Sequence, residues 1–322
     1  MSQSIVGVLV NPRAGTDVRR LLTGAATSTV EEKLNAVRRV VVGALESGAD
    51  RVLLSRDPFR IAGRATETLP SRERIEIVDH ELVHDHRDTV RSIEAFRAAG
   101  VAVVVALGGD GTSRAVAAAW PDGVLLPLST GTNNAFPFQV EPTVAGAAAG
   151  LVAGGRVRRD DVAARAKVVH ARLDGERTEV ALVDAVVTSD PYVGSLELFE
   201  PDRLRTAVMA VADPASVGFC GVTGRVAQCS ASVDGGVFVR FDSPASAERV
   251  VRAPTAPGYF ADVGVAEWRR IELAEPVRVP GPGILAVDGE RWARLDDEVV
   301  FEVRRDGPYV LDPWAAVRAG FG

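Results

Sequence analysis

The sequence of 322 residues contains few cysteines and few lysines. Two cysteines, Cys220 and Cys229, are too few for a disulfide framework in a chain of this length, and their spacing matches no metal site. The only lysines are Lys33 and Lys167, and neither stands in the glycine-rich setting of a Walker A loop. Any phosphate site in this protein must therefore be built in another way.

Long apolar runs are also absent. No stretch approaches the roughly 18 uninterrupted apolar residues that a membrane helix needs, and the first residues lack the basic and apolar segments of a signal peptide. A net charge of -6 and a pI near 5.4 give no general attraction to nucleic acid or to an anionic membrane. We therefore expect a cytoplasmic protein that binds no nucleic acid and does not insert into a membrane.

The apolar content is high enough for two packed domains. Hydrophobic residues make up 47% of the chain, and its length favours two domains over one. Up to residue 155, short β-branched runs alternate with helical stretches, which is typical of an α/β domain with a mostly parallel sheet. Strand-like runs without helices between them follow. We predict an α/β domain at 1–155, an antiparallel β-rich domain at 156–311, and a C-terminal segment, 312–322, that packs back on the first domain.

The pattern also predicts individual elements. In the first domain we expect strands at 5–10, 51–54, 74–78, 101–107 and 124–128, with helices at 30–46, 58–68, 89–99, 113–120 and 143–153. Thr29 and Glu32 have the spacing of a capping box at the first helix. In the second domain we expect strands at 166–173, 179–188, 236–241 and 299–303, a hairpin turn at Asp174-Gly175, and a helix at 203–211.

A glycine-rich turn follows the most apolar of these strands, and it consists of Gly108, Gly109, Asp110, Gly111 and Thr112. It should lie at the carboxyl end of a parallel strand, where open α/β sheets bind ligands. Glycines let backbone N–H groups approach a phosphate, and the following helix adds the positive end of its dipole. The aspartate would repel a phosphate unless it held a metal ion or accepted a proton, and both roles belong to phosphoryl transfer.

Two further loops carry polar groups at neighbouring strand ends. The second loop contains Thr130, Gly131, Thr132, Asn133 and Asn134, whose hydroxyl and amide groups can bond phosphate or ribose oxygens, although a plain polar loop explains it equally well. The first strand ends in Asn11-Pro12-Arg13-Ala14-Gly15, where Arg13 could hold a phosphate by paired hydrogen bonds or belong to a simple turn.

In this order the three segments resemble those of the NAD kinase, diacylglycerol kinase and phosphofructokinase superfamily, in which NPxxG, GGDGT and a later GTxN loop line a nucleotide site between two domains. The segments 32–39 and 129–134 are most similar to the ATP-NAD kinase-like acetoin-catabolism protein X branch. The resemblance implies transfer of a phosphoryl group from ATP, with Mg²⁺, to an alcohol group, and NAD is the best single acceptor. It also implies a homodimer or homotetramer that assembles through the second domain.

The resemblance further assigns roles to residues. It gives Asp110 the task of activating the 2′-hydroxyl of the adenosine ribose, as in NAD kinases, and makes Asn11, Asn134 and the loop glycines nucleotide contacts. Asp184 falls on the acid that grips the NAD ribose, while Val183 replaces its amide partner. In the lipid-kinase pattern of the second loop, Ala135 stands in place of an aspartate.

A second pair of candidate catalytic acids lies near the C-terminus. The segment Asp288-Gly289-Glu290 resembles the DGE element of bacterial lipid kinases, in which the acids are proposed to activate the acceptor hydroxyl. The alternative is a hairpin turn with solvated acids, because Asp-Gly is a strong turn signal.

Several alternatives stay open at this point. A lipid or small-polyol kinase, or a regulatory protein that binds NAD(H) or ATP without catalysis, fits the same motifs, and the donor could be ATP or polyphosphate. His80, His84 and His86 could be imagined as metal ligands, but their charged surroundings favour a solvated loop.

Overall fold

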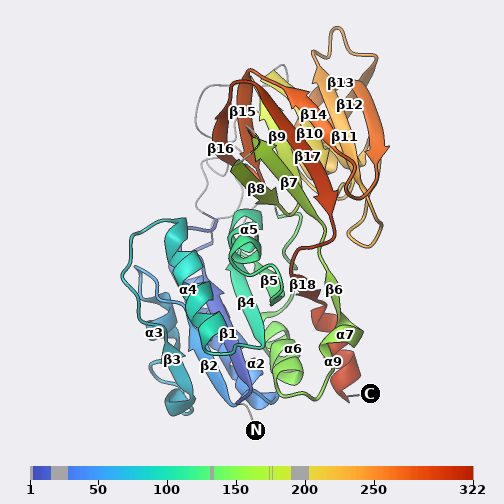
Figure 1. Ribbon diagram of the computed structural model, residues 1–322. Helices are drawn as coiled ribbons and strands as arrows, with labels where there is room; N and C mark the ends of the chain where they lie inside the picture. Colours follow the sequence, from blue (N-terminus) through green and yellow to red (C-terminus); the bar gives the residue numbers. More distant parts are fainter. Residues whose placement is uncertain are drawn as a thin grey trace.

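The computed structural model describes residues 3–15, 28–130, 134–173, 175, 177–189 and 203–321. It has two parts, one above the other in Figure 1: an α/β part around one mostly parallel sheet, and a β-rich part made of two antiparallel sheets. This confirms the predicted fold class. None of the helices among these residues is long and apolar enough to cross a membrane.

The sheet of the α/β part has the strand order β3-β2-β1-β4-β5-β18-β6. Its strands are β1 (Ile5–Val10), β2 (Arg51–Leu54), β3 (Ile75–Ile77), β4 (Val103–Gly108), β5 (Val124–Ser129), β6 (Ala163–Arg165) and β18 (Tyr309–Leu311). All pairs are parallel except β18 with β6. Every residue of β1 and β4 is buried, as expected for central strands with helices on both faces. The last two strands extend this sheet beyond the expected boundary at residue 155.

Helices cover both faces of this sheet. One face packs against α2 (Val30–Glu46), α3 (Ile61–Thr66), α6 (Pro142–Ala153) and the C-terminal α9 (Pro313–Phe321), and the other against α4 (His86–Ala98) and α5 (Asp110–Ala119). Short helical segments lie at η1 (Arg72–Arg74) and α7 (Arg159–Val162). The predicted capping box is present, since the Thr29 side chain accepts from Glu32 N–H and the Glu32 side chain from Thr29 N–H.

The β-rich part consists of a seven-stranded sheet, β12-β13-β11-β10-β9-β15-β16, and a four-stranded sheet, β14-β17-β7-β8. The strands are β7 (Val168–Leu173), β8 (Arg177–Ala181), β9 (Asp184–Thr188), β10 (Leu204–Met209), β11 (Gly236–Asp242), β12 (Arg249–Ala256), β13 (Tyr259–Ile271), β14 (Val277–Pro280), β15 (Gly283–Val287), β16 (Glu290–Leu295) and β17 (Glu298–Arg304). Fully buried residues such as Phe301 and Leu285 fill the space between the two sheets, and α8 (Phe219–Gly224) covers the far face of the larger one.

The structure corrects three sequence predictions, two of them in this part. The expected helix at 203–211 is wrong, because this segment is β10, hydrogen-bonded on both sides in the middle of the larger sheet. Its residues suit a helix locally, but two neighbouring strands satisfy its backbone instead. The single strand expected at 179–188 is two strands, β8 and β9, interrupted at Leu182 and Val183. The helix expected at 113–120 begins earlier, at Asp110.

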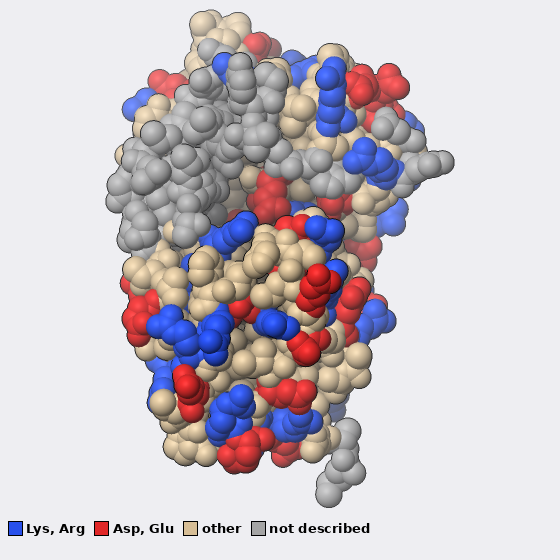
Figure 2. All heavy atoms as spheres, turned by 90° about the vertical axis from the view of Figure 1, so that its left-hand side faces the viewer, with Lys and Arg blue, Asp and Glu red and all other residues tan. Residues whose placement is uncertain are grey.

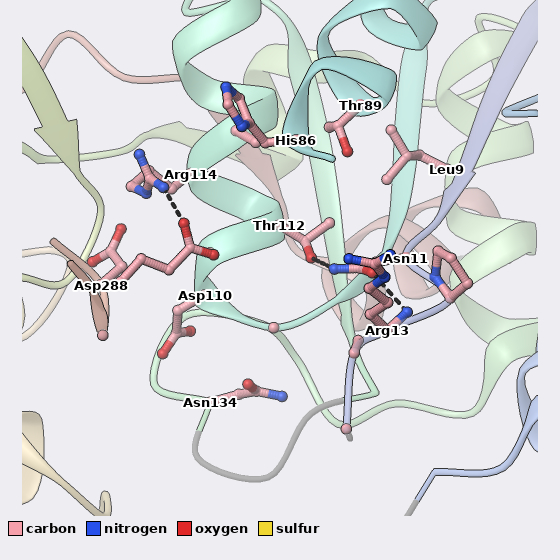
Figure 3. A pocket seen from close by; sticks show the side chains of 18 of the residues that line it. Leu9, Asn11, Arg13, His86, Thr89, Asp110, Thr112, Arg114, Asn134 and Asp288 are labelled. Atoms are coloured by element: carbon pink, nitrogen blue, oxygen red, sulfur yellow. Dashed lines mark hydrogen bonds and ion pairs between the residues drawn. The ribbon is translucent and has the colours of Figure 1, made fainter. Parts of the chain in front are cut away.

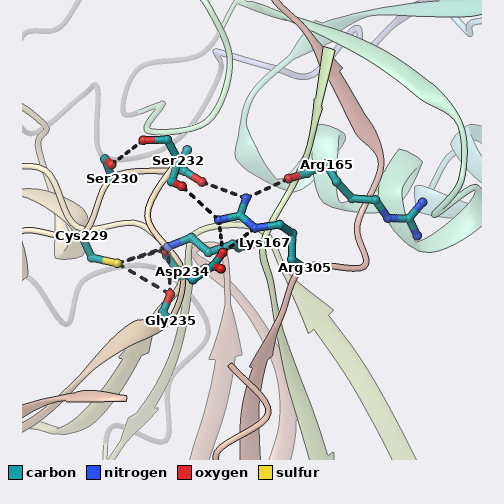
Figure 4. A network of polar contacts seen from close by, with 10 residues as sticks. Arg165, Lys167, Cys229, Ser230, Ser232, Asp234, Gly235 and Arg305 are labelled. Atoms are coloured by element: carbon teal, nitrogen blue, oxygen red, sulfur yellow. Dashed lines mark hydrogen bonds and ion pairs between the residues drawn. The ribbon is translucent and has the colours of Figure 1, made fainter. Parts of the chain in front are cut away.

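The chain passes between the two parts near residue 167 and returns near residue 306, and a polar network joins these crossings (Figure 4). The Lys167 ammonium is 2% exposed and donates to the Gly235 carbonyl at 2.8 Å, with the Cys229 thiol at 3.2 Å. Burial lowers the pKa of Lys167. Arg305 donates to the Asp234 carboxylate at 2.7 Å and to the Arg165 carbonyl at 3.1 Å. Both crossing segments are thereby tied to one turn of the β-rich part.

Charged side chains are interspersed over the face shown in Figure 2, where Lys and Arg alternate with Asp and Glu on the α/β part.

Candidate active site

A cavity of about 490 Å³ lies between the two parts. The α/β part lines it with the loops that follow β1 and β4, the segment after β5, and the start of α4. The β-rich part lines it with β9, the segment 217–220 and the β15–β16 hairpin. It therefore lies at the carboxyl ends of parallel strands, where open α/β sheets bind ligands.

The glycine turn forms the floor of this cavity. Gly109 is the N-cap of α5, and residues 109–112 all line the cavity. A Cβ on Gly108 would overlap the Thr112 side chain, and one on Gly109 would lie 2.8 Å from Asn134 Oδ1, so neither position has room for a larger residue. The first-turn amides of α5 have no intrahelical acceptor, and they suit an anionic ligand.

Asp110 joins this turn to the second predicted loop. Its carboxylate accepts hydrogen bonds from the N–H groups of Ala135, at 3.1 Å, and Phe136, at 2.9 Å. Thr130 N–H donates to the Gly108 carbonyl at 3.0 Å, and Asn134 donates to the Ser129 hydroxyl at 2.5 Å. The structure thus places the loops after β4 and β5 side by side. The predicted contacts Gly131, Thr132 and Asn133 lie outside the described residues.

The loop after β1 is bound to the glycine turn and to α2. The Asn11 amide donates to the Thr112 hydroxyl at 2.8 Å, and Asn11 Oδ1 accepts from Arg13 N–H at 2.9 Å (Figure 3). Lys33, only 1% exposed, donates to the Pro12 carbonyl at 2.6 Å. Sequence reasoning gave Lys33 no role, although a lysine in the first turn of an amphipathic helix was a usable signal.

Asp288 occupies the β15–β16 hairpin, where both Asp288 (φ 46°) and Gly289 (φ 76°) have left-handed conformations. The hairpin interpretation was therefore correct, but the expectation of solvated acids is wrong for Asp288. Its buried carboxylate accepts hydrogen bonds from the N–H groups of Leu182 (2.8 Å), Val183 (2.8 Å) and Asp184 (3.1 Å). The chain is interrupted between β8 and β9 at the residues whose N–H groups bond the Asp288 carboxylate.

The acids from the two parts influence one another. Burial, and after it the negative charge of Asp110, raise the pKa of Asp288 to about 7, although the hydrogen bonds from the three N–H groups act in the opposite direction. Burial likewise raises the pKa of the Cys220 thiol to about 11, with smaller contributions from the charges of Asp184 and Asp110. Asp184 is buried at the start of β9 and lines the cavity. Three predicted site acids, far apart in sequence, therefore share one electrostatic environment.

An ion-pair triad crosses from one part to the other at the cavity. Arg114, one helical turn beyond Asp110 on α5, bonds Glu179 of β8 at 3.1 Å and also pairs with Glu290 at the start of β16. Glu290 and Arg114 line the cavity, whereas Glu179 does not. Arg114 was missed in the sequence, where its only signal was a charge in an otherwise small and apolar helix.

Basic groups line the cavity as well as acids. Arg13, Arg56, His84 and His86 line it on the α/β side, and the two histidines are exposed. No group of three or more His, Cys, Asp or Glu residues is placed to hold a metal ion within the described ranges. The carboxylates of Asp110 and Asp288 alone could not complete the coordination of Mg²⁺. They fit an ion that is held by one or two carboxylates together with substrate phosphates and water, which is the usual arrangement for Mg²⁺.

Comparison with known proteins agrees with the predicted resemblance. Residues 6–157 match the ATP-NAD kinase N-terminal domain, and residues 167–306 match the acetoin catabolism protein X C-terminal domain. The acetoin catabolism protein X of Cupriavidus necator (strain ATCC 17699) is 32% identical over 332 residues, covering 98% of this chain and 91% of that relative. A crystal structure of a candidate diacylglycerol kinase from Bacillus anthracis str. Sterne shares the fold, with a TM-score of 0.50 at 12% identity, over 97% of this chain and 98% of that one.

Proposed function

We propose that this chain, which belongs to the acetoin catabolism protein X family, transfers the γ-phosphoryl group of ATP to an alcohol group of a small acceptor, with NAD as the first candidate. The ATP-NAD kinase domain and the shared fold support a phosphotransferase family. The observation that carries the proposal is the meeting of Asp110 and Asp288 across one cavity, close enough for the charge of one to raise the pKa of the other.

The α/β side of the cavity suits the nucleotide. The first turn of α5 supplies backbone N–H groups and the positive end of a helix dipole, and the loop after β1 adds Arg13. Asn11 bonds that loop to the glycine turn, and Lys33 bonds it to α2. Together with Thr130 and Asn134 beside it, this surface would orient the phosphate chain toward the acids. Bound Mg²⁺ would be held by phosphate oxygens and by whichever of Asp110 and Asp288 is not the base, and it would neutralise charge on the phosphates.

Asp110 is our choice of base. As the acceptor oxygen forms its bond to the γ-phosphorus, the bond from that phosphorus to the bridging oxygen breaks and ADP leaves. The hydroxyl proton passes to the carboxylate of Asp110, which two backbone N–H groups hold at the start of α5. The second choice of base is Asp288 or Glu290. The pKa of Asp288, about 7, suits proton exchange at neutral pH. Asp184 would contact the acceptor from the β-rich side.

A specific observation also favours a second acceptor class. The Asp288-Gly289-Glu290 hairpin, which resembles the lipid-kinase element, faces the same cavity. The neighbouring wall contains Val186, Phe219 and Ala286, which are apolar. A lipid or small polyol could therefore present its hydroxyl to Asp288 or Glu290 instead.

The test is a phosphorylation assay on a defined pool. The purified protein is incubated with Mg²⁺, ATP labelled at the γ-phosphate, and NAD, diacylglycerol, glycerol and acetoin, the last because the relative's name refers to it. Products are identified by mass spectrometry, and polyphosphate replaces ATP in a parallel reaction. We expect one phosphorylated acceptor, with NADP as the first product to look for.

Matched variants separate the candidate bases. Asp110→Asn should lower turnover by about a hundredfold to ten-thousandfold while the protein stays folded, because loss of a general base has effects of this size. Asp288→Asn should have the larger effect if the hairpin supplies the base. Binding of ATP or NAD without any phosphorylated product would contradict the proposal and favour a regulatory nucleotide-binding protein.

A further inference from the structure

Arg114 lines the cavity, but the proposed reaction gives it no role. It projects from α5 one turn after Asp110, and Figure 3 shows both side chains on the side of the helix that faces Asp288. Its side chain is only 12% exposed, and its Nε–H has no hydrogen-bond partner among the described residues. A guanidinium that is largely desolvated and incompletely bonded retains capacity for a further anionic oxygen.

Glu290 lies where such an anion would be bound. Its carboxylate pairs with Arg114, and it packs so closely on Gly111 that a Cβ at that position would overlap it. Gly111 belongs to the first turn of α5, whose amide groups and dipole favour negative charge. The Glu290 carboxylate therefore pairs with a guanidinium and lies against the first turn of a helix, and both of these also suit a phosphoryl group. Its side chain is 58% exposed, so it can leave without unpacking a core.

We propose that Arg114 binds the terminal phosphoryl group of the nucleotide and that the Glu290 carboxylate occupies this place until the nucleotide displaces it. The inference rests on the proposed function, since it assumes that ATP enters the cavity along the glycine turn. Arg114 then acts as a binding residue for the γ-phosphate, and Glu290 as an internal competitor.

Glu179, the second partner of Arg114, can keep the guanidinium in place while the nucleotide displaces Glu290. Glu179 bonds Arg114 at 3.1 Å from β8, is 18% exposed and does not line the cavity. It can keep one edge of the guanidinium fixed while the other edge exchanges Glu290 for a phosphoryl oxygen. The planar fork of arginine suits such two-sided bonding, whereas a lysine ammonium does not fix its direction in this way.

The test compares ATP with ADP, because only ATP carries the γ-phosphate. Dissociation constants of both nucleotides are measured by calorimetry in the presence of Mg²⁺, and the readout is the preference for ATP over ADP. Arg114→Gln should abolish the preference. Glu290→Gln should increase it by about tenfold to a hundredfold, the range of one charge-assisted hydrogen bond. In the double variant the gain from Glu290→Gln should disappear, since there is no guanidinium to compete for.

Controls make the result specific. Arg39→Gln removes a comparable ion pair, with Glu141 at 2.8 Å, outside the cavity, and should leave the preference unchanged. Glu179→Gln leaves Glu290 in place and should not reproduce the gain. The assignment is overturned if Arg114→Gln weakens ATP and ADP equally, or if Glu290→Gln leaves the preference as it was. A wild-type protein that binds neither nucleotide overturns the proposed function itself, which is a different result from either.

Discussion

The buried carboxyl group of Asp288 should make the stability of this protein depend on pH in a defined direction. In the unfolded chain its pKa is near 3.8, whereas in the folded protein burial and the charge of Asp110 raise it to about 7. The folded state thus prefers the protonated acid. The contribution of Asp288 to stability is fully present below about pH 4, is lost as the pH rises from about 4 to 7, and changes little above that.

The size of this loss follows from the same pKa values. A rise to about 7 from 3.8 corresponds to about 4 kcal/mol between the two ends of the window. The perturbation is Asp288→Asn, which cannot ionise. We expect the free energy of unfolding of the wild type, minus that of the variant, to fall by about this amount between pH 4 and pH 8. Urea unfolding followed by circular dichroism at several pH values measures both free energies, and titrating groups that do not interact with Asp288 cancel in the difference.

Two results would refute the reasoning. A difference that stays constant from pH 4 to pH 8 would mean that Asp288 is ionised throughout in the folded protein. The Asp110→Asn variant provides an independent check, because it removes the second cause of the raised pKa without touching the hairpin. It should lower the pKa of Asp288 and reduce the loss of stability across the window. An unchanged pH profile in Asp110→Asn would show that the two acids do not interact.

Three further predictions concern packing, capping and thiol chemistry. Gly146→Ala should destabilise the protein by about 1–3 kcal/mol in thermal or urea unfolding, because the new methyl group would overlap the backbone carbonyl of Val40 where α6 crosses α2. Asp57→Ala should cost about 1–3 kcal/mol in the same assay, since its buried carboxylate accepts three backbone N–H groups at the start of α3. Cys220 and Cys229 should resist a thiol reagent at pH 8 until denaturant is added, because both are buried and the pKa of Cys220 is raised to about 11; fast labelling of the native protein would contradict this.

Local sequence signals were sufficient for much of the α/β part. The continuous apolar run that became β4 predicts a buried parallel strand, and the glycines after it predict a tight turn into a helix. Thr29 and Glu32 predicted the start of α2 because a capping box depends only on neighbours three residues apart. These features are encoded within a few residues, so the α/β side of the candidate site could be predicted before the fold was known.

The sequence alone could not decide features that depend on distant partners. The segment 204–209 has residues that suit a helix, but hydrogen bonds to β9 and β11 on either side make it a strand. The Asp-Gly dipeptide fixed the β15–β16 turn, yet only the meeting of this hairpin with the break between β8 and β9 buries the Asp288 carboxyl group.

The candidate site acids show the same division most clearly. Asp110 could be recognised from its motif, whereas its electrostatic effect on Asp288 depends on two residues 178 positions apart lining the same cavity. Arg114 and Glu290 are separated by 176 positions, and their pairing exists only because the β-rich part lies over the N-terminus of α5. Propensity and turn chemistry act over one or two turns of chain, and they determined the strands of the α/β part and the glycine turn. Burial, and the pKa values and ion pairs that follow from it, were decided by packing between distant segments, both within the β-rich part and between the two parts.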